Sequence, residues 1–381
     1  MTTALIPGHA TMAATRQYAK ETGKACAEGH YSDFLNIHLQ LSSLGIGTFP
    51  GAPTDEIDEQ YASIIGQALT QGINVIDTGT HYRYGRSCSA IGEGLRRAMS
   101  QGVTREQVYL VSKGGFLVFR EGRPDDLAAW FQREVVLTGL GRTDDLVQAH
   151  CISPEYIGFQ LELSRQLMGV ETLDAFLVDQ PEVHIPVIGK EMLNRKLQKV
   201  FVVLEQAIKD GKLRHYGIST FNGFRVETDH QLFESLTSLQ GLAENAARQV
   251  WNDPAAKHHF KVVQIPFNQV MQEGFTRFNQ ATGQGNVAST IQAAHQLGIY
   301  LMASHTLFKG HLATQAMDAV VQTLPLMANH AQRALQFNRS TPGVGTTLVG
   351  VSTPAHLADV LAVCQIPPVE KAIYLQMYER A

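Results

Sequence analysis

Short apolar runs rich in β-branched residues recur along this chain, and several end in Gly, Ser, Thr or a charged residue. Each of the runs is short enough to be a strand, and helical patterns lie between most of them. The runs are Leu44–Thr48, Asn74–Asp77, Val108–Lys113, Leu173–Val178, His215–Ser219, Val262–Phe267, Ile299–Ser304 and Thr346–Val351. Strands that alternate with helices predict a parallel sheet covered by helices.

The intervening segments carry apolar residues at helical spacing. Predicted helices cover Asp58–Leu69, Tyr156–Leu167, Val200–Ile208, Val287–Leu297 and Pro354–Val363. Eight strand–helix units predict an α/β fold, a (β/α)8 TIM barrel. The alternative is an open doubly wound sheet, which usually carries GxGxxG after its first strand when it binds a dinucleotide. The sequence GIGTFPG at residues 45–51 does not fit that pattern.

Two connections are too long to be simple loops. Residues 114–150 and 221–261 would both leave the C-terminal face of a barrel, where active sites lie. We interpret them as insertions in one barrel domain, residues 41–381, that form either a substrate lid or an inert surface. Residues 1–40 are predicted to be an N-terminal extension, either a tail or a plug under the barrel floor.

Composition excludes several classes of protein. The chain has 381 residues, 31 Lys and Arg against 35 Asp and Glu, and a formal net charge of −4, which argues against nucleic-acid binding. It contains no run of about 18 apolar residues, so a membrane span is not expected. The N-terminal residues do not have the pattern of a secretory signal. Four scattered cysteines, Cys26, Cys88, Cys151 and Cys364, suggest reduced thiols in a cytoplasmic protein with no metal site.

Three residues at predicted strand ends form a set with acid–base chemistry. Asp77 ends the second run, Tyr82 follows it, and Lys113 ends the third run, 36 positions after Asp77. Because strand ends on one barrel face converge, the three side chains are expected to meet. A Lys beside a Tyr favours the phenolate and lowers the pKa of the phenol, and a carboxylate holds the Lys in place. Such a Tyr can exchange a proton near neutral pH.

The order and content of the strand ends resemble the aldo-keto reductase superfamily over roughly Leu41 to Val363. The segments that carry this resemblance are Leu44–Thr48, Gly72–Thr78, Ser112–Gly114, Tyr216–Thr220, Gln264–Asn268 and Leu348–Leu357. Three further patterns resemble one bacterial branch with a long third connection: YRxxRS from residue 82, HCxxP from residue 150 and FxRSTPG from residue 337.

This resemblance implies a (β/α)8 barrel that uses NADPH to reduce a small-molecule substrate. Tyr82 would be the general acid, Lys113 would lower the pKa of its phenol, and Asp77 would orient Lys113. Ser219 and Gln264 would bind the nicotinamide amide. Residues 304–312 would line the pyrophosphate, and residues 350–359 would hold the adenosine end. The full set of implied cofactor-binding residues is Thr48, Ser219, Thr220, Gln264, Ser304, Leu307, Gly350, Ser352, Thr353, His356 and Asp359.

The chain departs from the family pattern at two positions. The fourth strand of the family ends in a catalytic His, and this chain has Asp179 there. An ionised Asp179 cannot donate a hydrogen bond to a substrate carbonyl, whereas a protonated one can, so weak activity on generic aldehydes is expected. His150 and His184 are alternative imidazole donors. At the adenosine end, His356 stands where an Arg is common, so NADPH is the predicted cofactor and NADH an alternative.

Three functions compete at this point. The first is an NAD(P)H-dependent oxidoreductase that reduces a carbonyl or an activated C=C bond, with Tyr82 as proton donor and Asp179 in the catalytic set. The second is a barrel of this type that performs elimination or isomerisation without net redox. The third is a cofactor-binding regulatory subunit, which the resemblance to potassium-channel β-subunits suggests. The presence of Asp77, Tyr82 and Lys113 favours the first, and nothing in the sequence indicates the oligomeric state.

Overall fold

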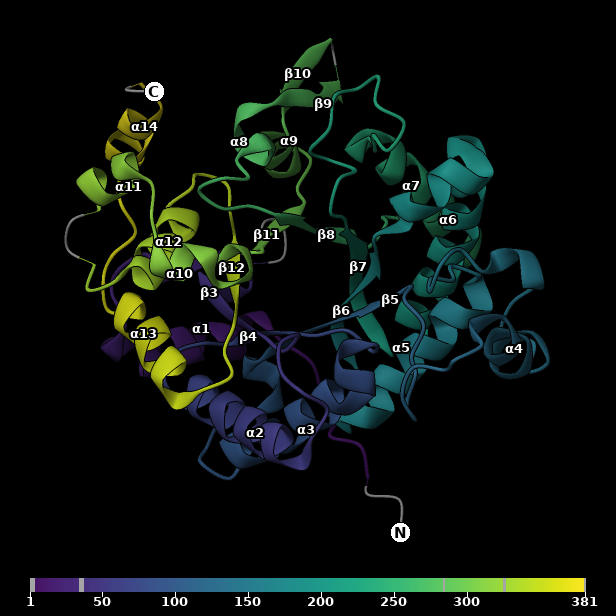
Figure 1. Ribbon diagram of the computed structural model, residues 1–381, viewed down its shortest axis with the longest axis horizontal. Helices are drawn as coiled ribbons and strands as arrows, with labels where there is room; N and C mark the ends of the chain where they lie inside the picture. Colours follow the sequence, from purple (N-terminus) through teal and green to yellow (C-terminus); the bar gives the residue numbers. More distant parts are fainter. Residues whose placement is uncertain (1–3, 34–37, 284, 325–326, 380–381) are drawn as a thin grey trace.

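The computed structural model describes residues 4–33, 38–283, 285–324 and 327–379. Within these residues, eight parallel strands form a closed barrel in the order β11-β12-β3-β4-β5-β6-β7-β8, and helices surround it (Figure 1). The predicted (β/α)8 fold is therefore confirmed. The barrel strands are β3 (Leu44–Gly47), β4 (Val75–Asp77), β5 (Tyr109–Gly114), β6 (Leu173–Asp179), β7 (Leu213–Ser219), β8 (Phe260–Pro266), β11 (Tyr300–Ser304) and β12 (Thr346–Gly350).

The helices that follow the barrel strands differ in length, and several shorter elements decorate the ends of the barrel. The helices are α1 (Met12–Glu21), α2 (Asp55–Thr70), α3 (Arg86–Met99), α4 (Leu127–Phe131), α5 (Pro154–Met168), α6 (Ile185–Lys209), α7 (Leu236–Trp251), α8 (Glu273–Thr276), α9 (Thr290–Gln296), α10 (His311–Thr314), α11 (Asp318–Thr323), α12 (His330–Arg339), α13 (Pro354–Cys364) and α14 (Lys371–Glu379). Two antiparallel hairpins lie outside the barrel, β1 (Tyr31–Asp33) with β2 (Gln40–Ser42) and β9 (Phe278–Gly283) with β10 (Asn286–Ser289).

Two sequence-based expectations need correction. The predicted helix Val287–Leu297 begins only at Thr290, because its first residues form β10 and Ser289 then caps the helix by accepting a hydrogen bond from the backbone N–H of Gln292. The predicted insertion at 221–261 contains α7, which packs against α6 as part of the helical ring. Small residues such as Ala243, Ala246 and Ala247 make up much of the buried face of α7 and weaken its apolar signal.

The segment between β5 and α5 is a folded excursion with its own small core. Phe116 and His150 pair as an antiparallel bridge at its base, and the backbone N–H of Cys151 donates to the carbonyl oxygen of Gly115 at 2.8 Å. Its buried apolar cluster consists of Leu117, Phe119, Phe131, Val135, Cys151 and Tyr156. The excursion leaves from the same end of the barrel as the strand ends that carry the predicted catalytic residues.

The N-terminal segment contacts the opposite end of the barrel. Ala10, Leu39 and Leu41 pack with inward-facing barrel residues. The backbone N–H of Ala10 donates to Asp174, whose carboxylate also forms a buried ion pair with Arg105 at 2.7 Å. These contacts agree with a plug under the barrel floor. Residues 1–3 and 34–37 of the predicted extension lie outside the described residues, and the division of the chain at residue 40 stays a prediction.

Neither a membrane-spanning helix nor a disulfide occurs in the part of the chain that the structure covers. No helix among those residues has the length and apolar character needed to cross a membrane. The four cysteines are free thiols.

We expect Gly115→Ala to destabilise the protein more than Gly122→Ala. Both glycines have a positive φ, +133° and +97°, which costs an L-residue about 1–3 kcal/mol. A Cβ at Gly122 meets nothing within 4 Å, whereas one at Gly115 would lie 2.5 Å from His150 Nε2. Overpacking therefore adds roughly 1–3 kcal/mol at Gly115 alone. Urea unfolding of both variants tests this order, and equal losses of unfolding free energy would contradict it.

Candidate active site

The C-terminal ends of β4 and β5 bring Asp77 and Lys113 together at the mouth of the barrel. Asp77 is the last residue of β4, and Lys113 lies near the end of β5. Lys113 Nζ is 2.6 Å from both Asp77 carboxylate oxygens and 2.9 Å from the carbonyl oxygen of Thr78. The Lys113 side chain is fully buried. The predicted pairing of these two residues is present in the structure.

The Lys113 ammonium uses all three of its N–H donors on these acceptors. Burial alone would lower the pKa of Lys113, but the surrounding acidic groups, Asp77 foremost and Asp179 with it, together outweigh that effect and hold the pKa above its ordinary value. Lys113 therefore remains a cation at neutral pH. It acts on its surroundings through its charge, because its donors are already occupied.

Tyr82 lies directly beside this cation. The Lys113 Nζ is 5.1 Å from the centre of the Tyr82 ring, and the Phe49 ring packs edge-to-face with the Tyr82 ring at 5.0 Å between ring centres. Burial raises the pKa of Tyr82 above its ordinary value, although the Lys113 charge opposes the shift. The sequence predicted a lowered pKa. The direction is the opposite because desolvation of the phenolate outweighs the ammonium, so Tyr82 is a neutral O–H donor.

Asp179 ends β6 and faces the same mouth. It lies opposite Ser219 of β7 in the parallel register and is 4% exposed. Burial raises the pKa of Asp179 to about 6, and the positive charge of Lys113 opposes that shift. The carboxyl thus changes its charge in mildly acidic solution, within the cluster that also contains Asp77 and Tyr82.

His150 and His184 are not available to a substrate. His150 Nε2 lies 2.7 Å from the Asp179 carbonyl oxygen, which can only accept, so this nitrogen carries the proton. Burial lowers the pKa of His150 to about 3, so the ring is neutral and its Nδ1 is an acceptor. The nitrogen Nε2 of His184 then donates to it at 2.9 Å. Both rings are 1% exposed, and together they hold the end of β6 through the hydrogen bond to the Asp179 carbonyl oxygen.

His81, which no pattern in the sequence singled out, occupies the mouth beside Tyr82. Its ring contacts that of Tyr82 at 4.7 Å and that of Phe116 at 4.9 Å between ring centres. Its Nε2 is 3.9 Å from Asp179 Oδ2. The available signal was its position in the same strand-end loop as Tyr82, one residue before it. That signal is weak, because the distance to Asp179 depends on how β6 is placed against β4.

Ser219 and Gln264 form a polar chain that reaches Asp77. Ser219 Oγ donates to Gln264 Oε1 at 3.2 Å, and Gln264 Nε2 donates to Asp77 Oδ1 at 3.1 Å. Ser219 is the last residue of β7, and it pairs in register with Gln264, which lies two residues before the end of the neighbouring strand β8. Neutral donors and acceptors of this kind suit an amide ligand, and they lie next to the Asp77–Lys113 pair.

Three other predicted cofactor residues already have protein partners. Thr48 Oγ1 donates to Thr78 Oγ1 at 2.8 Å. Thr220 Oγ1 donates to the buried carboxylate of Glu182, which also accepts the backbone N–H groups of residues 221 and 222. Asp359 accepts hydrogen bonds from two side chains at the start of the 329–339 segment, at 2.8 and 2.9 Å. In the structure, these three side chains therefore stabilise the loops around them through hydrogen bonds within the protein.

The remaining predicted cofactor residues lie near the ends of β11 and β12. Ser304 ends β11, and Leu307 follows in a loop where Lys309 has left-handed backbone geometry and an exposed side chain. Thr353 caps α13 by accepting the N–H of His356, which is itself exposed. Beside them lie Gly350 at the end of β12 and the partly exposed Ser352. The amino end of α13 and Lys309 both suit an anion such as a phosphate.

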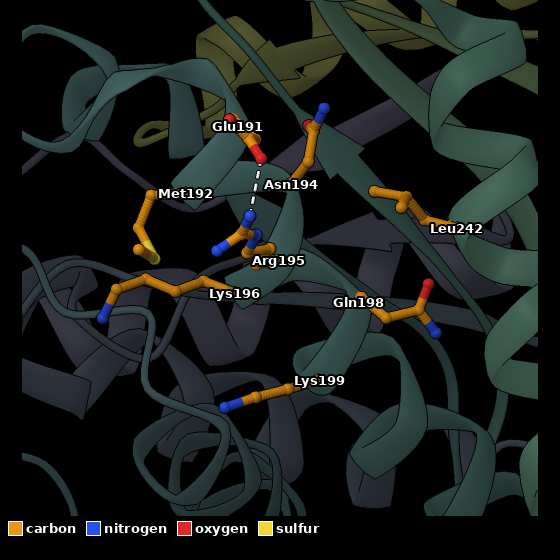
Figure 2. A pocket seen from close by; sticks show the side chains of 8 residues that line it. All are labelled: Glu191, Met192, Asn194, Arg195, Lys196, Gln198, Lys199 and Leu242. Atoms are coloured by element: carbon orange, nitrogen blue, oxygen red, sulfur yellow. Dashed lines mark hydrogen bonds and ion pairs between the residues drawn. The ribbon is translucent and has the colours of Figure 1, made fainter.

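A separate surface cavity of about 630 Å³ lies between α6 and α7 (Figure 2). It is lined by Glu191, Met192, Asn194, Arg195, Lys196, Gln198, Lys199 and Leu242. Figure 2 shows the Glu191–Arg195 ion pair, whose two residues lie one turn apart on the exposed face of α6. None of these lining residues belongs to a barrel strand or to the predicted site.

Residues 43–375 match the family described as "Aldo/keto reductase family", and this chain belongs to that family. A protein of Schizosaccharomyces pombe whose name places it among voltage-gated potassium channel β-subunits is 22% identical over 330 residues, 84% of each chain. The NADH-specific methylglyoxal reductase of Escherichia coli K12 is 25% identical over 197 residues, which are 50% of this chain and 51% of that protein.

Solved structures share the fold at low sequence identity. An aldo/keto reductase from Klebsiella pneumoniae in complex with NADP and acetate superimposes with a TM-score of 0.59 at 16% identity, covering 92% of this chain and 94% of that one. The holo form of an aldo-keto reductase from Bacillus halodurans has a TM-score of 0.60 at 16% identity, covering 92% and 96%. These similarities agree with the closed barrel described above.

We expect the Asp179 carboxyl to make stability depend on pH in a definite direction. Its raised pKa, about 6, means that the folded state holds this proton more tightly than the unfolded chain does. The contribution of Asp179 to stability is therefore greatest at acidic pH, and it falls by roughly 1–3 kcal/mol as the pH rises from about 4 to 6.

Asp179→Asn removes this titration, so the measurement is the difference in unfolding free energy between wild type and variant. We expect that difference to change in favour of the variant between about pH 4 and 6, and to be constant above pH 7. Urea unfolding at a series of pH values measures it. A difference that is independent of pH would show that burial does not raise the pKa of Asp179.

Proposed function

We propose that this protein is an NAD(P)H-dependent oxidoreductase that reduces a carbonyl or an activated C=C bond of a small organic molecule. The observation that supports this most directly is the buried Asp77–Lys113 pair beside a neutral Tyr82 at the barrel mouth. NADPH is the proposed cofactor, with NADH as the alternative. Tyr82 supplies a proton to the reduced substrate, and Lys113 stabilises the phenolate that remains.

The site residues fit a nicotinamide dinucleotide. Ser219 and Gln264 present amide-binding groups beside the acid–base cluster. The Lys309 ammonium and the partial positive charge at the amino end of α13 would attract the phosphates. The nicotinamide ring, when bound, supplies a hydride to the substrate. Tyr82 O–H donates the proton, and Lys113 remains charged throughout because Asp77 holds it. Protein groups thus contribute orientation and electrostatic stabilisation.

The names of the similar proteins agree with this proposal and also define its alternative. A reductase of Escherichia coli and NADP-bound barrels favour a catalytic role, and the NADH specificity of the former keeps NADH as a candidate. The channel β-subunit of Schizosaccharomyces pombe points to a binding role. Binding of a nicotinamide nucleotide without turnover of any carbonyl or enone would favour that binding role or non-redox chemistry.

We expect the protein to bind NADPH in the micromolar range, with Ser219 and Gln264 at the nicotinamide amide. Quenching of protein fluorescence during titration with NADPH, and separately with NADH, measures both affinities. Gln264→Leu should weaken binding by about tenfold, because it leaves the amide without a partner and costs roughly 1–2 kcal/mol. Failure of both nucleotides to bind at millimolar concentration would refute the proposed function.

We expect Tyr82→Phe to reduce turnover by roughly 10²–10⁴-fold, because it removes the general acid. Its affinity for NADPH should stay within about twofold of wild type, since the hydroxyl acts at the reacting centre. Steady-state NADPH oxidation with a panel of aldehydes and enones is the measurement.

Tyr84→Phe is the matched control for this substitution. Tyr84 packs against the small buried cluster of the segment between β5 and α5 and not against Lys113. It should retain activity. Lys113→Met would leave the buried Asp77 unpaired and cost about 3–5 kcal/mol of stability, so the double variant Asp77→Asn, Lys113→Met is the better probe of the pair. Wild-type turnover in Tyr82→Phe would mean that another group donates the proton.

A further inference from the structure

The imidazole of His81 is placed where a neutral hydrogen-bond donor would face a substrate at this site. It precedes Tyr82 in the chain, and the two rings are in edge-to-face contact with centres 4.7 Å apart. Phe116 covers another side of the imidazole at 4.9 Å. The side chain is 17% exposed, so it is partly open at the mouth while most of its surface is packed.

The two ring nitrogens of His81 have different surroundings. Nδ1 is buried and has no hydrogen-bond partner among the described residues. Nε2 faces Asp179 Oδ2 at 3.9 Å, which is too long for a hydrogen bond. The nearby carboxylate favours a proton on Nε2 over one on Nδ1. His81 is therefore expected to present an Nε2–H that no protein acceptor in the described chain engages.

The charge state of His81 also suits a donor role. Burial and, to a lesser extent, the nearby Lys113 cation together lower the pKa of His81 to about 3, so the ring is neutral at physiological pH. A neutral imidazole N–H donates to a carbonyl oxygen without carrying a net charge into the site. Of the other two imidazoles near this strand end, His150 uses both nitrogens, on His184 and on the Asp179 carbonyl oxygen, and His184 is 1% exposed behind it.

We infer that His81 donates a hydrogen bond from Nε2 to the oxygen of a carbonyl substrate, and that Asp179 is the positioning residue that fixes this tautomer. This inference rests on the proposed function and narrows its substrate class to aldehydes and ketones. The hydride supplied by the nicotinamide bonds to the carbonyl carbon, and the electron pair of the C=O π bond moves to oxygen. That oxygen takes the proton from Tyr82, and the nicotinamide is oxidised.

The position of His81 also explains how the site can reduce a carbonyl although β6 ends in an acid. An ionised Asp179 that touched the substrate directly would repel the developing negative charge on oxygen. Asp179 instead acts on the tautomer of His81, because its carboxylate favours a proton on Nε2, and the imidazole rather than the acid donates to the substrate oxygen. The sequence-based expectation of weak aldehyde reduction assumed that no imidazole was present at the mouth. His81 supplies one from the neighbouring strand end.

Aromatic side chains give the same site an apolar wall. Phe49, which is 66% exposed, contacts Tyr82, and Phe116 contacts His81. A substrate carbonyl that receives hydrogen bonds from Tyr82 and His81 would therefore place its carbon substituents against these rings. Apolar or aromatic aldehydes are consequently the first compounds to test.

The test compares His81→Phe with His81→Gln. Phe keeps an aromatic ring against Tyr82 and Phe116 but removes the donor, whereas Gln retains an N–H. We expect His81→Phe to lower kcat/KM for aldehydes by about 10²–10³-fold, as for loss of one oxyanion donor, with NADPH affinity within about twofold of wild type. His81→Gln should retain within about tenfold of wild-type kcat/KM. His295→Phe, on the exposed face of α9, is the matched control.

Asp179→Asn tests the positioning role with readouts that a merely structural role would not move. The groups facing Asp179 are Lys113, Asp77, Tyr82, His81 and Glu182. We expect the wild-type pH profile of kcat/KM to rise through an apparent pKa near 6, the value to which burial raises the pKa of Asp179, and Asp179→Asn to lose this acidic limb. Nitrogen-15 spectra should show an Nε2–H tautomer for His81 in the wild type and a mixture in the variant.

The outcomes separate this inference from the proposed function. Absence of NADPH oxidation with every carbonyl tested would refute both. Wild-type aldehyde reduction that survives in His81→Phe would overturn the role of His81 and leave the proposed function standing. An Nδ1–H tautomer in the wild type, assigned by the signal that His81→Gln removes, would likewise overturn the inference. A normal unfolding midpoint for each variant confirms that it is folded.

Discussion

The buried ion pair between Asp77 and Lys113 is the interaction on which the mouth of the barrel depends. It places two opposite charges where they are almost fully removed from water, and such a pair is stable only when its hydrogen bonds are satisfied. The Asp77 carboxylate accepts hydrogen bonds from Lys113 and Gln264, and Lys113 also donates to the Thr78 carbonyl oxygen. These bonds join β4, β5 and β8, so the charge that acts on Tyr82 is held by three elements of the barrel wall.

The ends of β4 and β6 are fixed by different kinds of contact. At β6, two buried neutral imidazoles in series hold the Asp179 backbone, and the Asp179 side chain remains directed at the mouth. At β4, the turn after Asp77 places His81 and Tyr82 side by side. The result is a site with one permanent cation paired with the Asp77 carboxylate, a second carboxyl, Asp179, whose charge depends on pH, and two neutral donors. That distribution suits a reaction in which negative charge develops on one oxygen.

Membership of the aldo/keto reductase family does not by itself decide the activity. The family match covers residues 43–375, and the similar proteins include one named as a reductase, 25% identical over 197 residues, and one named as a channel β-subunit, 22% identical over 330 residues. The same barrel can serve either role, because function depends on the side chains at the mouth. Here Asp77, Lys113 and Tyr82 lie together at the mouth, which is the physical reason to propose catalysis.

The sequence by itself determined the barrel, because the apolar period of a buried strand and the residues that end it are local properties. All eight predicted strands match barrel strands to within a few residues, and Asp77, Lys113, Tyr82 and Asp179 lie at the mouth as expected. Helix α7 was overlooked because its buried face consists largely of alanine. Only the tertiary structure decided the protonation states at the mouth. Burial reversed the expected pKa shift of Tyr82, and the approach of β6 to β4 placed Asp179 3.9 Å from His81. Desolvation and distance between strands depend on packing, and a linear pattern of residues does not contain them.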